Sequence, residues 1–135
     1  MSPPDRDRPL VLIIDDSPTE QIVFVRWLKA AGYDVATADD GTSGVEKARL
    51  ERPDAILLDI VMPGMSGFQV ARQLRKDPAT STVGIVVVTT KREDSERYWA
   101  MKQGADRYLT KPVAEADLLA ALAEVLAARA APPTG

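Results

Sequence analysis

A short apolar run that ends in one carboxylate is the feature that most constrains this chain. The run is Ala55–Leu58, Asp59 follows it directly, and a Pro63-Gly64 turn comes next. Unbroken apolar runs of this length are typical of strands that are buried on both faces of a parallel sheet. Because ligands bind at the carboxyl ends of such strands, Asp59 is a candidate nucleophile, metal ligand or turn carboxylate.

The same pattern recurs along the chain, where strand-like segments alternate with helix-like segments. Strands are predicted at residues 10–14, 55–58, 83–88 and 107–109, and a short edge strand is predicted between Asp34 and Asp39. Helices are predicted between Ser17 and Gly32, between Gly41 and Pro53, from Ser66 onward, from about Glu93 to Gln103, and around Leu118–Leu126. This alternation predicts an α/β fold, a doubly wound five-stranded parallel sheet with helices on both faces that forms a three-layer sandwich.

The apolar content of the strands predicts their order in the sheet. The first, third and fourth strands are the most apolar and are expected at the centre, with the second and fifth at the edges. The order 2-1-3-4-5 meets this condition, and its switch point lies between the first and third strands. Asp15 and Asp16 follow the first strand, so we expect them to meet Asp59 in one crevice.

Local signals add detail to two of the helices. Ser17 and Glu20 have the spacing of a capping box, and Pro18 stands at the first helical position. Tyr98 and Trp99 are neighbours on the fourth helix, and adjacent helical residues do not face the same way. One of these two aromatic residues is therefore expected in the core, and the other on the surface.

Composition excludes several classes of function. The chain has no histidine and no cysteine, which rules out a histidine kinase, a His-ligated zinc enzyme, a Ser-His-Asp hydrolase and thiol chemistry. A net charge of −3 gives no electrostatic basis for binding nucleic acid or a membrane surface. The sequence lacks the run of roughly 20 apolar residues that a membrane helix needs and the apolar centre of a signal peptide, so we expect a cytoplasmic location.

The expected crevice has the composition of a phosphoryl-transfer site. Carboxylates that are gathered and partly desolvated repel one another, so a cation is expected among them. Mg²⁺ or Mn²⁺ suits oxygen ligands, Lys111 after the fifth strand offers an ammonium group, and Thr89 after the fourth offers a hydroxyl. Since carboxylates can attack phosphorus to form an aspartyl phosphate, Asp59 is the candidate acceptor.

Taken together, these residues resemble the receiver domain of bacterial response regulators. The matching segments are Asp15-Asp16, Asp59 with Met62–Gly67, Thr89, and Gly104–Pro112. The resemblance covers about residues 10–127 and implies a flavodoxin-like, CheY-like fold with the same 2-1-3-4-5 order. We expect a receiver domain at residues 10–129, between a disordered lead-in at 1–9 and a flexible tail at 130–135.

The resemblance implies how the phosphoryl group and the metal would be held. Asp59 would accept the phosphoryl group from the phosphohistidine of a partner kinase. Asp16, Asp59 and the backbone carbonyl of Val61 would bind Mg²⁺ directly, while Asp15 would act largely through water. Lys111 would contact the phosphoryl group.

The resemblance also implies how the signal would leave the site. The peptide bond between Lys111 and Pro112 would be cis, Thr89 would move toward the phosphoryl group, and Tyr108 would change rotamer with it. These movements would remodel the face formed by the fourth helix, the fifth strand and the fifth helix. A downstream protein target is expected on that face, so the chain would be a signalling switch that catalyses only its own phosphorylation and dephosphorylation.

Within the family, the chain resembles the PilH-type regulators of type IV pilus twitching motility. The segments that carry this likeness include Asp15–Glu20, Asp59–Gly64, Val88–Lys91 and Tyr108–Val113. They imply a CheA-like histidine kinase as phosphodonor. No DNA-binding or enzymatic domain follows the last predicted helix, so we expect a stand-alone regulator that signals by protein contact or serves as a phosphate sink.

Two rival classes share parts of this pattern. Haloacid dehalogenase phosphatases also form an aspartyl phosphate, but a second aspartate stands two residues after their nucleophile, where this chain has Val61. Flavodoxin-like FMN carriers share the sheet order but need a phosphate loop rich in glycine, serine and threonine after the first strand, where Asp15 and Asp16 would repel a phosphate. Turnover of an external phosphate ester, or a yellow purified protein, would favour one or the other rival.

Overall fold

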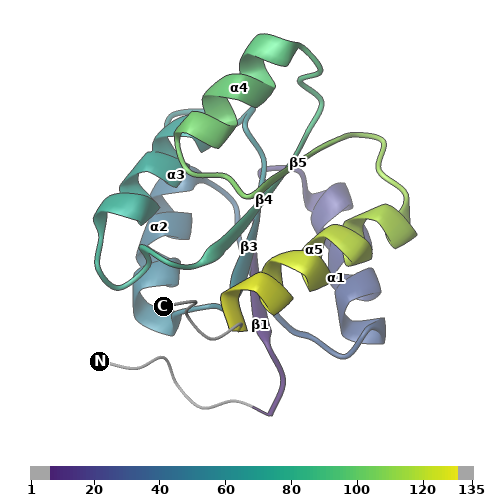
Figure 1. The fold of residues 1–135 in the computed structure, drawn as a ribbon. Helices are drawn as coiled ribbons and strands as arrows, with labels where there is room; N and C mark the ends of the chain where they lie inside the picture. Colours follow the sequence, from purple (N-terminus) through teal and green to yellow (C-terminus); the bar gives the residue numbers. More distant parts are fainter. Residues whose placement is uncertain (1–6, 131–135) are drawn as a thin grey trace.

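The computed structural model describes residues 7–130 and contains a five-stranded parallel sheet (Figure 1). The strands are β1 (Leu10–Ile14), β2 (Asp34–Ala38), β3 (Ala55–Leu58), β4 (Gly84–Thr89) and β5 (Arg107–Thr110). Their order is β2-β1-β3-β4-β5, and every neighbouring pair is parallel. The predicted strand order is confirmed, and the three most apolar strands lie at the centre.

Helices cover both faces of this sheet. They are α1 (Pro18–Ala30), α2 (Gly41–Glu51), α3 (Gly67–Lys76), α4 (Asp94–Lys102) and α5 (Glu115–Ala130). Figure 1 shows α1 and α5 on one side of the sheet and α2, α3 and α4 on the other. This arrangement confirms the predicted three-layer sandwich.

The side chains of the strands alternate between two separate hydrophobic clusters. Leu12 and Ile14 of β1 point into the cluster under α2, α3 and α4, whereas Val11 and Ile13 point into the cluster under α1 and α5. All four are at most 1% exposed, so β1 is buried on both faces. This double burial explains why the central strands are unbroken apolar runs rather than alternating patterns.

The fourth helix departs from the prediction made for its aromatic residues. Tyr98 and Trp99 are both on the surface, with 57% and 55% of their area exposed. Only Ala100 of α4 is buried, so the helix packs against the sheet through a small residue and leaves both rings outside. The rings contact each other edge to face, with centroids 6.1 Å apart. The expectation that one of them belongs to the core is wrong.

Most of the predicted terminal segments, residues 1–9 and 130–135, lies outside the described part of the chain. Within that part, α5 continues through Ala130, one residue beyond the predicted end of the domain. Between residues 7 and 130, none of the helices has the length and apolar character that crossing a membrane requires.

Candidate functional site

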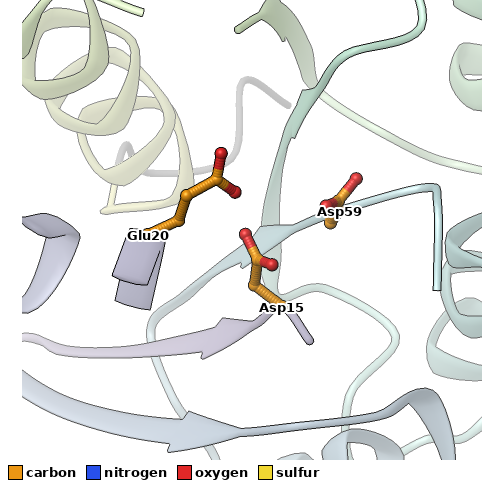
Figure 2. A group of neighbouring side chains, drawn as sticks. All are labelled: Asp15, Glu20 and Asp59. Atoms are coloured by element: carbon orange, nitrogen blue, oxygen red, sulfur yellow. The ribbon is translucent and has the colours of Figure 1, made fainter. Parts of the chain in front are cut away.

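Asp15 and Asp59 lie side by side at the carboxyl ends of two neighbouring strands (Figure 2). Ile14 and Leu58, the last residues of β1 and β3, are register partners, and the backbone N–H of Asp59 donates to the Ile14 carbonyl at 3.0 Å. Asp15 is 2% exposed and Asp59 is 7% exposed. The structure therefore brings these two carboxylates together at the predicted switch point and removes both from bulk water.

Lys111 reaches these carboxylates from the end of β5. Its Nζ lies 3.0 Å from Asp15 Oδ2 and 3.0 Å from Asp59 Oδ2, and it also donates to Glu20 Oε2. Lys111 is itself buried, and the peptide bond to Pro112 is cis, as predicted. A buried ammonium group thus joins three carboxylates, two that directly follow β1 and β3 and one from α1.

Glu20 is the member of this cluster that the sequence prediction missed. The side chain of Ser17 caps α1 by accepting from the Glu20 N–H at 3.3 Å, as the capping-box prediction requires. The reciprocal half differs, because the Ser17 N–H donates to Asp15 Oδ1 at 2.9 Å and the Glu20 carboxylate binds Lys111 instead. The only sign of Glu20 in the sequence is its spacing from Ser17. That spacing does not distinguish a glutamate that completes a capping box from one whose carboxylate reaches over the edge of the sheet.

Asp16 and Val61 occupy the outer part of the site. Asp16 follows Asp15 directly, and its side chain is exposed. It does not belong to the group of carboxylates that the structure brings together, which consists of Asp15, Glu20 and Asp59. Val61 is 46% exposed, and its N–H donates to Asp59 Oδ1 at 3.1 Å. That bond orients the Asp59 carboxylate against Lys111, which holds the other oxygen.

Thr89 and Tyr108 lie on the neighbouring strands β4 and β5. Thr89 ends β4 and is completely buried, and its Oγ1 accepts from the Lys91 N–H at 3.4 Å. Tyr108 in β5 is 6% exposed, and its hydroxyl donates to the Lys91 carbonyl at 2.8 Å. Both side chains thus bind the backbone of Lys91, so one loop after β4 connects the predicted switch residues.

The loop after Asp59 returns close to the strand end because Gly67 has no side chain. The Gly67 N–H donates to the Ile60 carbonyl at 3.0 Å. A Cβ at this position would overlap the backbone of Asp59 and Ile60. Glycine is therefore needed here for close approach of two backbone segments, and this packing supports the carboxylate at the site.

The electrostatics of the cluster reflect its burial and its single ammonium group. Burial raises the pKa of Asp15, against the opposing effects of the Ser17 N–H and of Lys111. For Lys111, burial alone would lower the pKa, but its hydrogen bonds to Glu20, Asp15 and Asp59 outweigh burial, and the pKa is raised above its usual value. Lys111 is therefore charged at neutral pH and is surrounded by an excess of negative charge.

An Asp15→Asn protein should be more stable than the wild type without Mg²⁺, by about 1 kcal/mol at neutral pH. Because folding raises the pKa of Asp15, its ionised form weakens folding above the raised pKa. That cost disappears as the pH falls below the unfolded value of 3.8. The gain in stability from asparagine should therefore shrink as the pH falls from above the raised pKa of Asp15 to below 3.8. Urea unfolding at several pH values measures it, and a variant less stable than the wild type at neutral pH would contradict repulsion in the site.

The donor atoms of the cluster fit a hard divalent cation. Oxygen atoms of Asp15, Glu20 and Asp59 lie within 4.8 Å of one another, and sets of oxygen donors suit Mg²⁺. Because Asp15 and Asp59 are buried, water solvates their charges only in part. The single ammonium group of Lys111 does not balance three carboxylates, so the cluster keeps a net negative charge. The chemistry of the site therefore matches the predicted metal.

The fold and the site together define the class of protein. Residues 11–123 match the response regulator receiver domain, so the chain belongs to this family. Receiver domains are signalling switches that accept a phosphoryl group from histidine kinases and bind Mg²⁺ at an acidic pocket.

Individual relatives agree with this assignment. The chain is 49% identical over 117 residues to protein PilH of Pseudomonas aeruginosa, an alignment that spans 87% of this chain and 97% of PilH. Its structure is similar to that of chemotaxis protein CheY4 of Vibrio cholerae, with 32% identity and a TM-score of 0.83, over 87% of this chain and 98% of that one. The predicted resemblance to PilH-type regulators is confirmed.

A third relative is described with a bound metal. The receiver domain of sensor histidine kinase PA1611 from Pseudomonas aeruginosa has a magnesium ion coordinated in its active site cleft. It is 29% identical to this chain with a TM-score of 0.83, and the match covers 89% of this chain and 98% of that one.

Proposed function

We propose that Asp59 accepts a phosphoryl group from the phosphohistidine of a partner kinase. The observation that carries this proposal is the placement of the Asp59 carboxylate, which is 7% exposed, between Lys111 Nζ at 3.0 Å and the Val61 N–H at 3.1 Å. In the transfer, a carboxylate oxygen forms a bond to phosphorus and the bond from phosphorus to the histidine nitrogen breaks. The released imidazole nitrogen takes a proton from water.

The proposed metal is Mg²⁺ or Mn²⁺, held by Asp16, Asp59 and the backbone carbonyl of Val61, with Asp15 acting largely through water. The bound ion supplies positive charge to the phosphoryl oxygens during transfer. The negative cluster around Asp59 and the magnesium ion in the PA1611 receiver domain support this proposal. Lys111 would supply a second positive charge next to the acceptor, because its Nζ lies 3.0 Å from Asp59 Oδ2, and the exposed side chain of Asp16 would be free to bind the ion.

Removing the metal should prevent phosphorylation by a small-molecule donor. With acetyl phosphate and Mg²⁺, we expect intact-mass spectrometry to show one phosphoryl adduct on the protein. With the same donor and excess EDTA, the adduct should fall by at least about tenfold, because the developing charge then lacks its cation. Equal adduct formation in both samples would argue against a metal at this site.

The proposed switch connects Asp59 to the surface through Thr89 and Tyr108. Thr89 is expected to turn its hydroxyl toward the phosphoryl group and thereby release the Lys91 N–H, which it now binds at 3.4 Å. Tyr108 also binds the backbone of Lys91, so movement of this loop would change its rotamer. A local change in charge would in this way alter a surface that another protein reads.

The proposed output surface is the face of α4, β5 and α5. It holds a cavity of about 480 Å³ whose lining includes Arg97, Arg107, Tyr108, Asp117 and Glu124. Because Tyr108 lines this cavity and also binds the loop near the phosphorylation site, a change at Asp59 can alter the cavity. The chain would then pass its signal by contact between proteins, or would act as a phosphate sink if no target binds.

A state-dependent partner can be captured directly. The immobilised protein, with and without beryllium fluoride and Mg²⁺, should retain a downstream protein at least several-fold better in one of the two states. An Arg107→Ala protein should lose this difference, because Arg107 lines the cavity. Capture of the same proteins in equal amounts from both states would reject this face as a phosphorylation-dependent surface.

The pathway is also a proposal. Similarity to PilH of Pseudomonas aeruginosa over nearly the full length of both chains supports a CheA-like kinase as phosphodonor and a role in type IV pilus motility. Phosphotransfer from a purified CheA-like kinase that outpaces transfer from an unrelated kinase would support it, and equal rates from both would count against it. A cytoplasmic location stays a prediction made from the sequence.

A further inference from the structure

All three N–H donors of the Lys111 ammonium group are in use in this structure. They bind Asp15, Asp59 and Glu20, and an ammonium group has three donors. A phosphoryl group on Asp59 that requires Lys111 must therefore take a donor from one of the three carboxylates.

Glu20 is the carboxylate that can be released most easily. Its side chain is 37% exposed, whereas those of Asp15 and Asp59 are 3% and 8% exposed. Asp15 is also held by the Ser17 N–H and Asp59 by the Val61 N–H. Glu20 lies at the solvent side of Lys111, where water can replace the ammonium group as its hydrogen-bond donor.

We propose that Glu20 competes with the phosphoryl group for Lys111 and so sets how readily the phosphorylated state forms. This inference rests on the proposed role of Asp59 as phosphoryl acceptor. In the unphosphorylated protein, Glu20 holds the third donor of Lys111 and keeps the ammonium group in the carboxylate cluster. In the phosphorylated protein, the phosphoryl oxygens take over that donor, and Glu20 turns to solvent. Glu20 is a positioning residue, because it acts on the phosphoryl group through Lys111.

A merely structural role for Glu20 would lie at the start of α1. Its N–H is capped by Ser17, and a negative side chain in the first turn of a helix gives modest stabilisation. That role requires the charge near the helix terminus but no contact with Lys111. Two substitutions separate the roles. Glu20→Gln removes the charge and keeps the length, while Glu20→Asp keeps the charge and shortens the reach by one methylene.

Beryllium fluoride provides the test, because it mimics a phosphoryl group on aspartate without a chemical step. We would titrate it in saturating Mg²⁺ and follow amide chemical shifts of the protein. We expect Glu20→Gln to bind it about fivefold more tightly than the wild type, because a competing charge next to the ligand is gone. Glu20→Asp should also bind it more tightly, by a smaller factor. Glu46→Gln, which removes an exposed charge on α2, should match the wild type.

Each outcome decides the proposal. Tighter binding by both Glu20 variants supports competition for Lys111. If only Glu20→Gln binds beryllium fluoride more tightly, the charge of Glu20 matters but its contact with Lys111 does not, and the proposal is overturned. The proposal is also overturned if both variants bind it with the affinity of the wild type, or more weakly. A wild-type protein that binds no beryllium fluoride with Mg²⁺ would instead refute the proposed function. Normal binding by the wild type together with unchanged variants refutes only the role of Glu20.

Discussion

A Lys111→Met protein is expected to be less stable than the wild type in the absence of Mg²⁺, by about 3 kcal/mol in the free energy of unfolding. Lys111 is buried and is the positive partner of Asp15, Asp59 and Glu20. Methionine has a similar length and no charge, so the substitution leaves the carboxylates close together without their ammonium group. Removing one partner of a buried charge cluster costs far more than breaking an exposed ion pair.

Mg²⁺ should restore part of the stability that this variant loses. The ion and the ammonium group neutralise the same carboxylates, so Mg²⁺ should stabilise Lys111→Met more than it stabilises the wild type. Urea unfolding with Mg²⁺ and with EDTA measures both effects. Lys91→Met is the matched control, since Lys91 is exposed and pairs with Glu96 at 3.6 Å, and it should change stability by less than about 0.5 kcal/mol. Equal stability of Lys111→Met and wild type in EDTA would contradict the charge balance described for the site.

The arrangement of the sheet could be predicted because burial on two faces leaves a direct trace in sequence. Central strands such as Ala55–Leu58 have no solvent side and therefore no polar residues. The edge strand β2 is partly exposed and carries a weaker apolar pattern. The order 2-1-3-4-5 places these strands at the centre, and with that order Asp15 meets Asp59 at the switch point.

The contact between Glu20 and Lys111 could not be predicted, because the capping box and Lys111 offer the Glu20 carboxylate two alternative partners. The spacing from Ser17 fits a capping box, a local motif that the sequence shows directly. Lys111 is 91 positions away in the chain, and its distance from Glu20 depends on how α1 and β5 are placed around the sheet. A local sequence pattern does not show which charges the tertiary structure brings close. The Glu20 carboxylate therefore binds Lys111, while the Ser17 half of the capping box forms as predicted.

The aromatic pair on α4 was mispredicted for a related reason. Adjacent helical residues do face different directions, but this argument assumes that the helix has a wide buried face. On α4 the buried contact consists of Ala100, so Tyr98 and Trp99 both lie outside it. How far a helix is covered depends on its neighbours in three dimensions, and the sequence of the helix alone does not contain this information.

An Asp59→Asn protein is expected to take up no phosphoryl group from acetyl phosphate. Asparagine is close to aspartate in size, and its single side-chain oxygen can still accept from Lys111 or from the Val61 N–H, so the fold should remain intact. Its amide is not a nucleophile for phosphorus, and the variant also loses a charge that would bind the metal. Asp34→Asn is the control, because Asp34 is an exposed residue at the edge strand β2 and has no role in the proposed chemistry.

Intact-mass spectrometry after incubation with acetyl phosphate and Mg²⁺ tests the central claim most directly. The wild type and Asp34→Asn should each gain the mass of one phosphoryl group, and Asp59→Asn should gain none. Peptide mapping of the wild type should place the group on the segment that contains Asp59. A phosphoryl adduct of the same extent on Asp59→Asn as on the wild type would contradict the assignment of Asp59 as the acceptor.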